Sequence, residues 1–67
     1  MATKTIADIK KGSIWFNHIN YLNLEILEVH AERNMVTVAD SIETKFQDTV
    51  PVKDFLEQCR LVWEPKQ

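Results

Sequence analysis

The clearest feature of the chain is a pair of segments in which hydrophobic and polar residues alternate, separated by Ala-Glu-Arg-Asn at positions 31–34. The first alternating segment covers residues 22–29, and the second covers residues 35–38. Alternation with a period of two is typical of a β-strand that buries one face. Two such strands with a short connection predict a β-hairpin over residues 23–39.

The alternation in the first segment changes phase between Ile26 and Leu27. A shift of one residue exchanges the two faces of a strand, so the change predicts a β-bulge or a sharp bend at this position. The competing interpretation is a helix. The residues that fall roughly on one helical stripe are Leu22, Ile26, Leu27 and Val29.

Three further strands are predicted from segments rich in β-branched and aromatic residues. The first covers residues 13–16 and follows Gly12, which marks a turn because glycine adopts positive φ at little cost. The second covers residues 42–46, where Ile, Thr and Phe alternate with Glu and Lys. The third covers residues 60–63, so that the hairpin and these segments make five strands.

The segment around Pro51 is predicted to end a strand. Proline fixes its own φ, disfavours helical geometry at the preceding residue and lacks the N–H that a central strand needs. Residues 49–52 should therefore be extended and lie at a sheet edge or a strand end. A short helical turn is predicted next, over residues 53–58. The residues whose spacing places them on one face of it are Val52, Phe55, Leu56 and Cys59.

Length and composition predict a single folded domain over residues 1–67. A chain of 67 residues buries only about 60% of the surface that its unfolded form exposes, so nearly every large hydrophobic residue is needed in the core. The 45% hydrophobic content, with one Gly and two Pro, is typical of a globular domain. We expect residues 1–5 to be flexible and residues 64–67 to form a polar tail.

Cysteine content and net charge limit the cellular location and the class of partner that we expect. The single cysteine, Cys59, excludes an internal disulfide framework and argues against a cysteine-based zinc site. Small secreted domains usually carry disulfides, so we expect a cytoplasmic protein. No hydrophobic run is long enough for a signal peptide or a membrane span, so no membrane partner is expected. A net charge of -2 has the wrong sign for neutralising many phosphates, which makes nucleic acid the less favoured partner.

The order of the predicted elements resembles that of the SH3-like barrels, a superfamily that includes Tudor domains and many small phage and bacterial domains. The segments that carry the resemblance are Lys11-Gly12-Ser13-x-Trp15, the bent hairpin, and Val50-x-Val52-x-x-Phe55 leading to Leu61-Val62-Trp63. The resemblance implies a mainly β fold: a small, five-stranded, partly open barrel with a short helical turn before the last strand. It also implies that the first loop and its flanking strand line a surface that binds peptides.

One cluster of residues has a functional interpretation. Its predicted partner-binding members are Trp15, Phe16, Asn17, His18 and Tyr21. Consecutive residues of a strand point to opposite faces, so either Trp15 or Phe16 should lie outside the core and need a partner. Two alternatives remain: Tyr21 or Trp63 covers that ring, or a homodimer buries it.

No catalytic residue, metal site or cofactor is predicted. His18 and His30 lie on different segments, without a carboxylate or cysteine at a recurrent ligand spacing. Cys59 has no histidine or basic cluster near it in the sequence, and we interpret it as a small buried hydrophobic residue. The aspartates are separate turn or cap residues rather than an oxygen-ligand loop.

We therefore predict a non-enzymatic protein-interaction module, an accessory or inhibitory protein of phage or bacterial type. The alternative is a nucleic-acid or nucleotide-binding domain, in which basic side chains supply charge and exposed aromatic rings stack on bases. The basic residues of that alternative are Lys10, Lys11, Lys45, Lys53 and Arg60. An enzyme ranks third, because a pocket of roughly a few hundred cubic ångströms is hard to form in so small a core.

Overall fold

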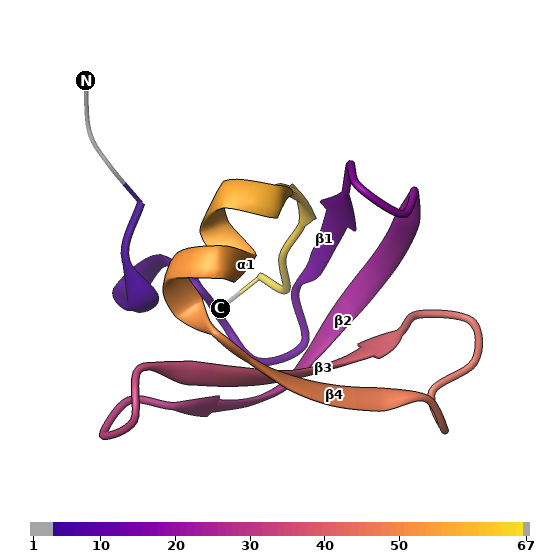
Figure 1. Ribbon diagram of the computed structural model, residues 1–67. Coiled ribbons are helices and arrows are strands. Elements are labelled where there is room, and N and C mark those ends of the chain that lie inside the picture. Colours follow the sequence, from indigo (N-terminus) through magenta and orange to yellow (C-terminus); the bar gives the residue numbers. More distant parts are fainter. Residues whose placement is uncertain (1–3, 67) are drawn as a thin grey trace.

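The computed structural model describes residues 4–66 as one open antiparallel sheet with a helix over one of its faces (Figure 1). Its elements are the 3-10 helix η1 (Ile6–Asp8), the strands β1 (Ile14–Asn17), β2 (Leu22–His30), β3 (Met35–Asp40) and β4 (Gln47–Pro51), the helix α1 (Val52–Gln58) and the strand β5 (Cys59–Trp63). The strand order is β4-β3-β2-β1-β5, so β4 and β5 form the two edges. The predicted mainly β fold, with five strands and a helical segment before the last strand, is confirmed.

The hairpin of β2 and β3 is confirmed together with its bulge. The register between the two strands shifts between Ile26 and Glu28, so Leu27 is the extra residue. On either side of the bulge, Ile26 is fully buried and Val29 packs against the core. The bulge therefore lets residues of opposite parity face the same core, which explains the phase change in the sequence.

β1 begins one residue later than predicted, behind a turn made by Lys11 and Gly12. Gly12 has a φ of 88°, and its N–H donates to the carbonyl of Ile26 at 2.8 Å. The fully buried Ser13 donates its hydroxyl to the carbonyl of Lys10 and accepts the indole N–H of Trp15 at 3.0 Å. The serine thus satisfies the one polar group of the largest core side chain.

The core lies between the sheet and α1, with Trp15 and Phe55 in contact at its centre. Their ring centroids are 5.1 Å apart, and the ring planes are inclined by 59°. The other buried members are Ile9, Ile26, Val36, Val38, Val52 and Cys59. The predicted helical turn is confirmed, and its hydrophobic face packs on the sheet as expected.

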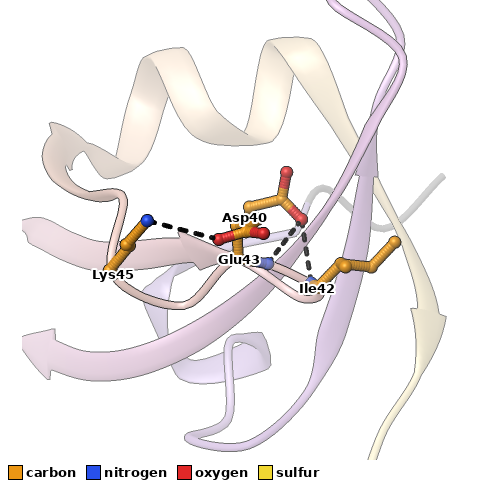
Figure 2. A network of polar contacts seen from close by, with 4 residues as sticks. All are labelled: Asp40, Ile42, Glu43 and Lys45. Carbon is orange, nitrogen blue, oxygen red and sulfur yellow. Dashed lines mark hydrogen bonds and ion pairs between the residues drawn. The ribbon is translucent and has the colours of Figure 1, made fainter.

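The predicted strand over residues 42–46 is wrong. These residues form a loop between β3 and β4, and the side chain of Ile42 is 86% exposed. The cause is Asp40, whose Oδ1 accepts the backbone N–H groups of Ile42 at 2.8 Å and of Glu43 at 3.4 Å (Figure 2). Backbone groups that bond to a nearby side chain do not join a sheet ladder. The alternation in this loop therefore has no structural counterpart, and the fourth strand is β4.

Three further predictions concern Pro51, residues 1–5 and residues 64–67. Pro51 ends β4 at the sheet edge and precedes the first turn of α1, as predicted. Of the residues predicted to be flexible, residues 1–3 lie outside the described part of the chain, whereas the N–H of Thr5 donates to the Asp8 carboxylate at 2.7 Å. In the predicted polar tail, Pro65 packs beside Gly12, and residue 67 is outside the described part.

Candidate functional site

Two asparagine side chains shape the loop between β1 and β2. Asn17 Oδ1 accepts the backbone N–H groups of Ile19 at 2.8 Å and Asn20 at 3.3 Å, and Asn20 Oδ1 accepts that of Leu22 at 3.2 Å. The carbonyl of Asn17 also accepts the N–H of Tyr21 at 2.8 Å. Asn17 is only 8% exposed, so this predicted partner-binding residue mainly holds the loop, although it also lines the groove between α1 and the sheet.

His18 fastens the same loop to the end of α1. Its backbone N–H donates to the carbonyl of Gln58 at 2.9 Å, and its ring Nε2 lies 3.1 Å from the carbonyl of Glu57. A carbonyl oxygen only accepts hydrogen bonds, so Nε2 carries the proton in this contact. The exposed His18 therefore positions the loop relative to the helix.

Tyr21 is held in a strained conformation and displayed to solvent. Its φ is 61°, in the left-handed region, where a bulky side chain costs on the order of 1–3 kcal/mol. The side chain is 77% exposed, so little burial offsets this cost. The hydrogen bonds of the loop thus keep an aromatic ring in a place that contributes little to the stability of the fold.

Four side chains gather on the face of β1 and β5 that points away from α1: Phe16, Tyr21, Arg60 and Trp63. We term them the aromatic face. The rings of Phe16 and Tyr21 have centroids 6.2 Å apart, and the Arg60 guanidinium lies 5.6 Å from the Phe16 ring centroid. Trp63 lies opposite Ile14 in the register and is 56% exposed. Directly opposed residues share a face of the sheet, so Trp63 lies on the same face as Ile14. Phe16 is two residues after Ile14 in β1 and shares that face, so Trp63 and Phe16 lie on the same side.

Trp15, one of the predicted partner-binding residues, does not belong to the aromatic face. It is fully buried against Phe55 and leaves no surface for a partner, because the strand turns Trp15 toward α1 and Phe16 away from it. Arg60 and Trp63 were not among the predicted site residues. The signal that would identify them is the pairing of β1 with β5, which periodicity within one segment does not reveal.

A groove of about 440 Å³ lies between α1 and the inner face of the sheet, and we term it the acidic groove. Its hydrophobic lining includes Leu22, Leu24, Val38, Phe46, Val50 and Phe55. The charged residues of the lining are Asp40, Asp48 and Asp54, which come from β3, β4 and α1, and the lining contains no Lys, Arg or His among residues 4–66. Asp40 uses one oxygen to cap the neighbouring loop, and Figure 2 shows its other oxygen outside these contacts.

A second hollow of about 650 Å³ lies between α1 and the segment around η1, and we term it the basic hollow. Its charged lining residues are Lys4, Lys53, Arg60 and Glu57. The residues that α1 contributes here differ from those that it contributes to the acidic groove. The helix therefore separates a concave surface with three carboxylates from one with an excess of cations.

The cysteine and histidine side chains are buried or hydrogen-bonded within the fold. Cys59 is 8% exposed, and burial raises the pKa of its thiol from 9.0 to about 11, so the nucleophilic thiolate is scarce at neutral pH. His30 Nε2 lies 2.8 Å from the hydroxyl of Thr37, which lies 2.8 Å from that of Thr49. Within residues 4–66, no three His, Cys, Asp or Glu side chains are placed to share a metal ion.

We expect the Cys59 thiol to alkylate slowly at neutral pH, with a rate that rises toward a midpoint near pH 11. The pKa of the thiol is higher in the folded state than in the unfolded chain. The contribution of the protonated thiol to the free energy of unfolding is therefore complete below about pH 9 and is lost as the pH rises toward about 11. Iodoacetamide kinetics and urea unfolding across this range test both statements. Cys59→Ala should remove the part of the stability loss that belongs to the thiol. An alkylation midpoint near that of a free thiol would contradict the burial argument.

Comparison of the chain with protein-family models, with curated proteins and with solved structures gave no match. In the described part of the chain, no helix combines the length and the hydrophobicity needed to cross a membrane. The surfaces with binding potential are the aromatic face, the acidic groove and the basic hollow.

Proposed function

We propose that the chain is a non-enzymatic protein-interaction module that binds a partner protein through the aromatic face. The observation that carries the proposal is Tyr21, which combines a φ of 61° with a side chain that is 77% exposed. Backbone strain that persists without a packing reason is characteristic of functional positions. In a domain with so small a core, a displayed and strained aromatic ring is best explained by contact with a second molecule.

The composition of the aromatic face indicates the chemistry of the partner. Tyr, Trp and Arg are the residues that contribute most often to binding energy at protein interfaces. Phe16 is half-buried and already in contact with Tyr21 and Arg60, so the open area belongs to Tyr21 and Trp63. This area is hydrophobic with one cationic edge, which suits a hydrophobic segment of a partner protein flanked by an acidic residue.

The resemblance to SH3-like barrels supports the same assignment. Five short strands, tight connections and a helical segment directly before the last strand agree with that type of fold. In such domains the first loop and its flanking strand often form the partner-binding surface, and here this loop carries Tyr21. We propose an SH3-like domain whose first loop serves partner binding.

We propose an accessory or inhibitory role in the cytoplasm, and the remaining chemistry supports it. The thiol of Cys59 is free, whereas small exported domains usually carry disulfides. The raised pKa of that thiol and the structural contacts of His18 and His30 support a role without catalysis.

Tyr21→Asn is expected to abolish partner capture while leaving the melting temperature equal or higher. Asparagine tolerates positive φ, so the strain of about 1 kcal/mol or more is relieved while the ring is lost. Capture is measured by pull-down, and stability by thermal unfolding. Ile42→Asn is the matched control, because Ile42 is also a loop residue and is 86% exposed.

A parallel loss of capture and melting temperature in Tyr21→Asn would contradict the proposal, as would an equal loss of capture in Ile42→Asn. Native mass spectrometry adds the test for a second copy. If the protein is a dimer and Tyr21→Asn converts it to a monomer, the partner of the aromatic face is a second copy of the chain.

The basic hollow favours the second candidate function, binding of a nucleic acid or nucleotide. Three of its four charged lining residues are the cations Lys4, Lys53 and Arg60, and the Arg60 guanidinium also lies over the Phe16 ring of the aromatic face, which can stack on a base. Such binding would weaken steeply as salt is raised. A single-stranded oligonucleotide that binds at low salt with this dependence would favour the alternative, and no binding at low salt would remove it.

A further inference from the structure

The acidic groove lies on the opposite face of the sheet from the aromatic face and has its own chemistry. Its floor is hydrophobic, and its three carboxylates face no basic side chain within the lining. The nearest cation shown beside the lining is Lys45 in the neighbouring loop, whose Nζ lies 3.9 Å from the Glu43 carboxylate and 5.4 Å from the ring centroid of the lining residue Phe46. The groove therefore has a net negative field over an apolar surface, which favours an occupant that is cationic and apolar.

One rim of the groove is the edge strand β4. Asp48 lies opposite Val38 and Val50 lies opposite Val36, and because Val38 and Val36 are buried, Asp48 and Val50 face inward with them. Thr49, between them, points to the other face. Asp48 and Val50 thus place a carboxylate and a hydrophobic side chain two residues apart on the inward face of the edge strand.

This edge has strand β3 on one side only. An edge strand presents unpaired backbone groups, and an extended peptide can add to such an edge through main-chain hydrogen bonds. Each second side chain of an added strand would face the same side as Asp48 and Val50. Positions two residues apart in the added segment would therefore enter the groove together.

We propose that the acidic groove and the edge of β4 bind an extended segment of a partner protein in which Lys or Arg stands two positions from a hydrophobic residue. The hydrophobic side chain packs on the apolar lining, and the cation lies among Asp40, Asp48 and Asp54. The segment adds to the sheet as a sixth strand. None of the four side chains of the aromatic face lines the groove, so either binding proposal can be wrong without the other.

The test uses the full chain labelled with ¹⁵N and two synthetic peptides of identical composition. In Thr-Arg-Thr-Val-Thr-Arg-Thr, the Arg and Val side chains share one face of a strand. In Thr-Arg-Val-Arg-Thr-Thr-Thr, Val and Arg lie on opposite faces. We expect the first peptide to shift the amide signals of β4 and α1 and to bind at least about tenfold more tightly than the second.

Charge reversal at the edge provides the second arm. Asp48→Lys should weaken the first peptide by about tenfold or more, because a like charge then opposes its arginines. Glu32→Lys is the matched control, since Glu32 is exposed, lies in the turn between β2 and β3 and undergoes the same change of charge. We expect this control to change the affinity by less than about twofold.

Several results would overturn the proposal. Equal affinity of the two peptides, or equal weakening by Asp48→Lys and Glu32→Lys, would reduce the effect to general charge attraction. Saturation of the groove by arginine amide alone would make it a small-cation site. Shifts confined to Arg60 and Trp63 of the aromatic face, or no shifts at all, would remove the groove as a docking site. Trp63 belongs to the aromatic face and does not line the groove, so in Trp63→Ala the first peptide should bind as in the wild type, which keeps this outcome separate from that of the aromatic face.

Discussion

Trp15→Ala is expected to destabilise the domain by about 3–5 kcal/mol, the usual cost of removing a large buried aromatic side chain. Trp15 is fully buried, and its ring contacts Phe55 with centroids 5.1 Å apart. At roughly 0.05–0.15 kcal/mol per residue, a domain of this length has a total stability of about 3–10 kcal/mol. The substitution should therefore unfold a large fraction of the molecules, which urea unfolding followed by circular dichroism will show.

Trp63→Ala is the matched control for this experiment. It removes the same side chain from a position that is 56% exposed, so the expected loss is below about 1 kcal/mol. Similar losses in the two variants would contradict the assignment of Trp15 to the core and of Trp63 to the surface. Ser13→Ala adds a smaller readout of the same core, because it removes the acceptor of the Trp15 indole N–H.

Phe55→Ala is expected to cost a similar amount, about 3–5 kcal/mol, for a different structural reason. Phe55 is 2% exposed and is the aromatic side chain through which α1 packs on the sheet. Without it, the helix loses its main hydrophobic contact with the sheet, and the acidic groove loses part of its hydrophobic lining. Thermal unfolding and the helical circular dichroism signal measure the two consequences.

Phe46→Ala provides the comparison, since Phe46 is 64% exposed in the loop between β3 and β4. We expect less than about 1 kcal/mol of destabilisation. The milder pair Trp15→Phe and Phe55→Leu allows a double-mutant cycle in folded protein. A coupling of about 0.5–1.5 kcal/mol is expected for this aromatic contact. Additive losses would show that the two rings stabilise the domain independently.

Periodicity revealed the parts of the fold in which hydrophobic side chains decide the structure. Alternation located β2 and β3, and its phase change located the bulge at Leu27, because burial on one face dictates both. The segment at 42–46 shows the same alternation, but the Asp40 side chain competes for its backbone N–H groups. Such competition between a side chain and a sheet ladder leaves no periodic signal.

The candidate sites were predictable only in part. Parity indicated that Trp15 and Phe16 face opposite sides, but the side that holds the core depends on where α1 packs. The left-handed conformation of Tyr21 follows from the hydrogen bonds around Asn17, which no composition rule indicates. The acidic groove combines aspartates from three elements, so it exists only once the chain has folded.

The position of β1 in the sheet bears on how the domain folds. β1 pairs with β2 on one side and with β5 on the other, so β1 needs as its neighbour a strand that is synthesised only after β2, β3, β4 and α1. Until β5 has left the ribosome, one side of β1 has no partner strand and the core around Trp15 is incomplete. Such pairing between segments far apart in the sequence slows folding and exposes hydrophobic surface meanwhile. We therefore expect a chain truncated before residue 59 to leave the hydrophobic side chains around Trp15 exposed.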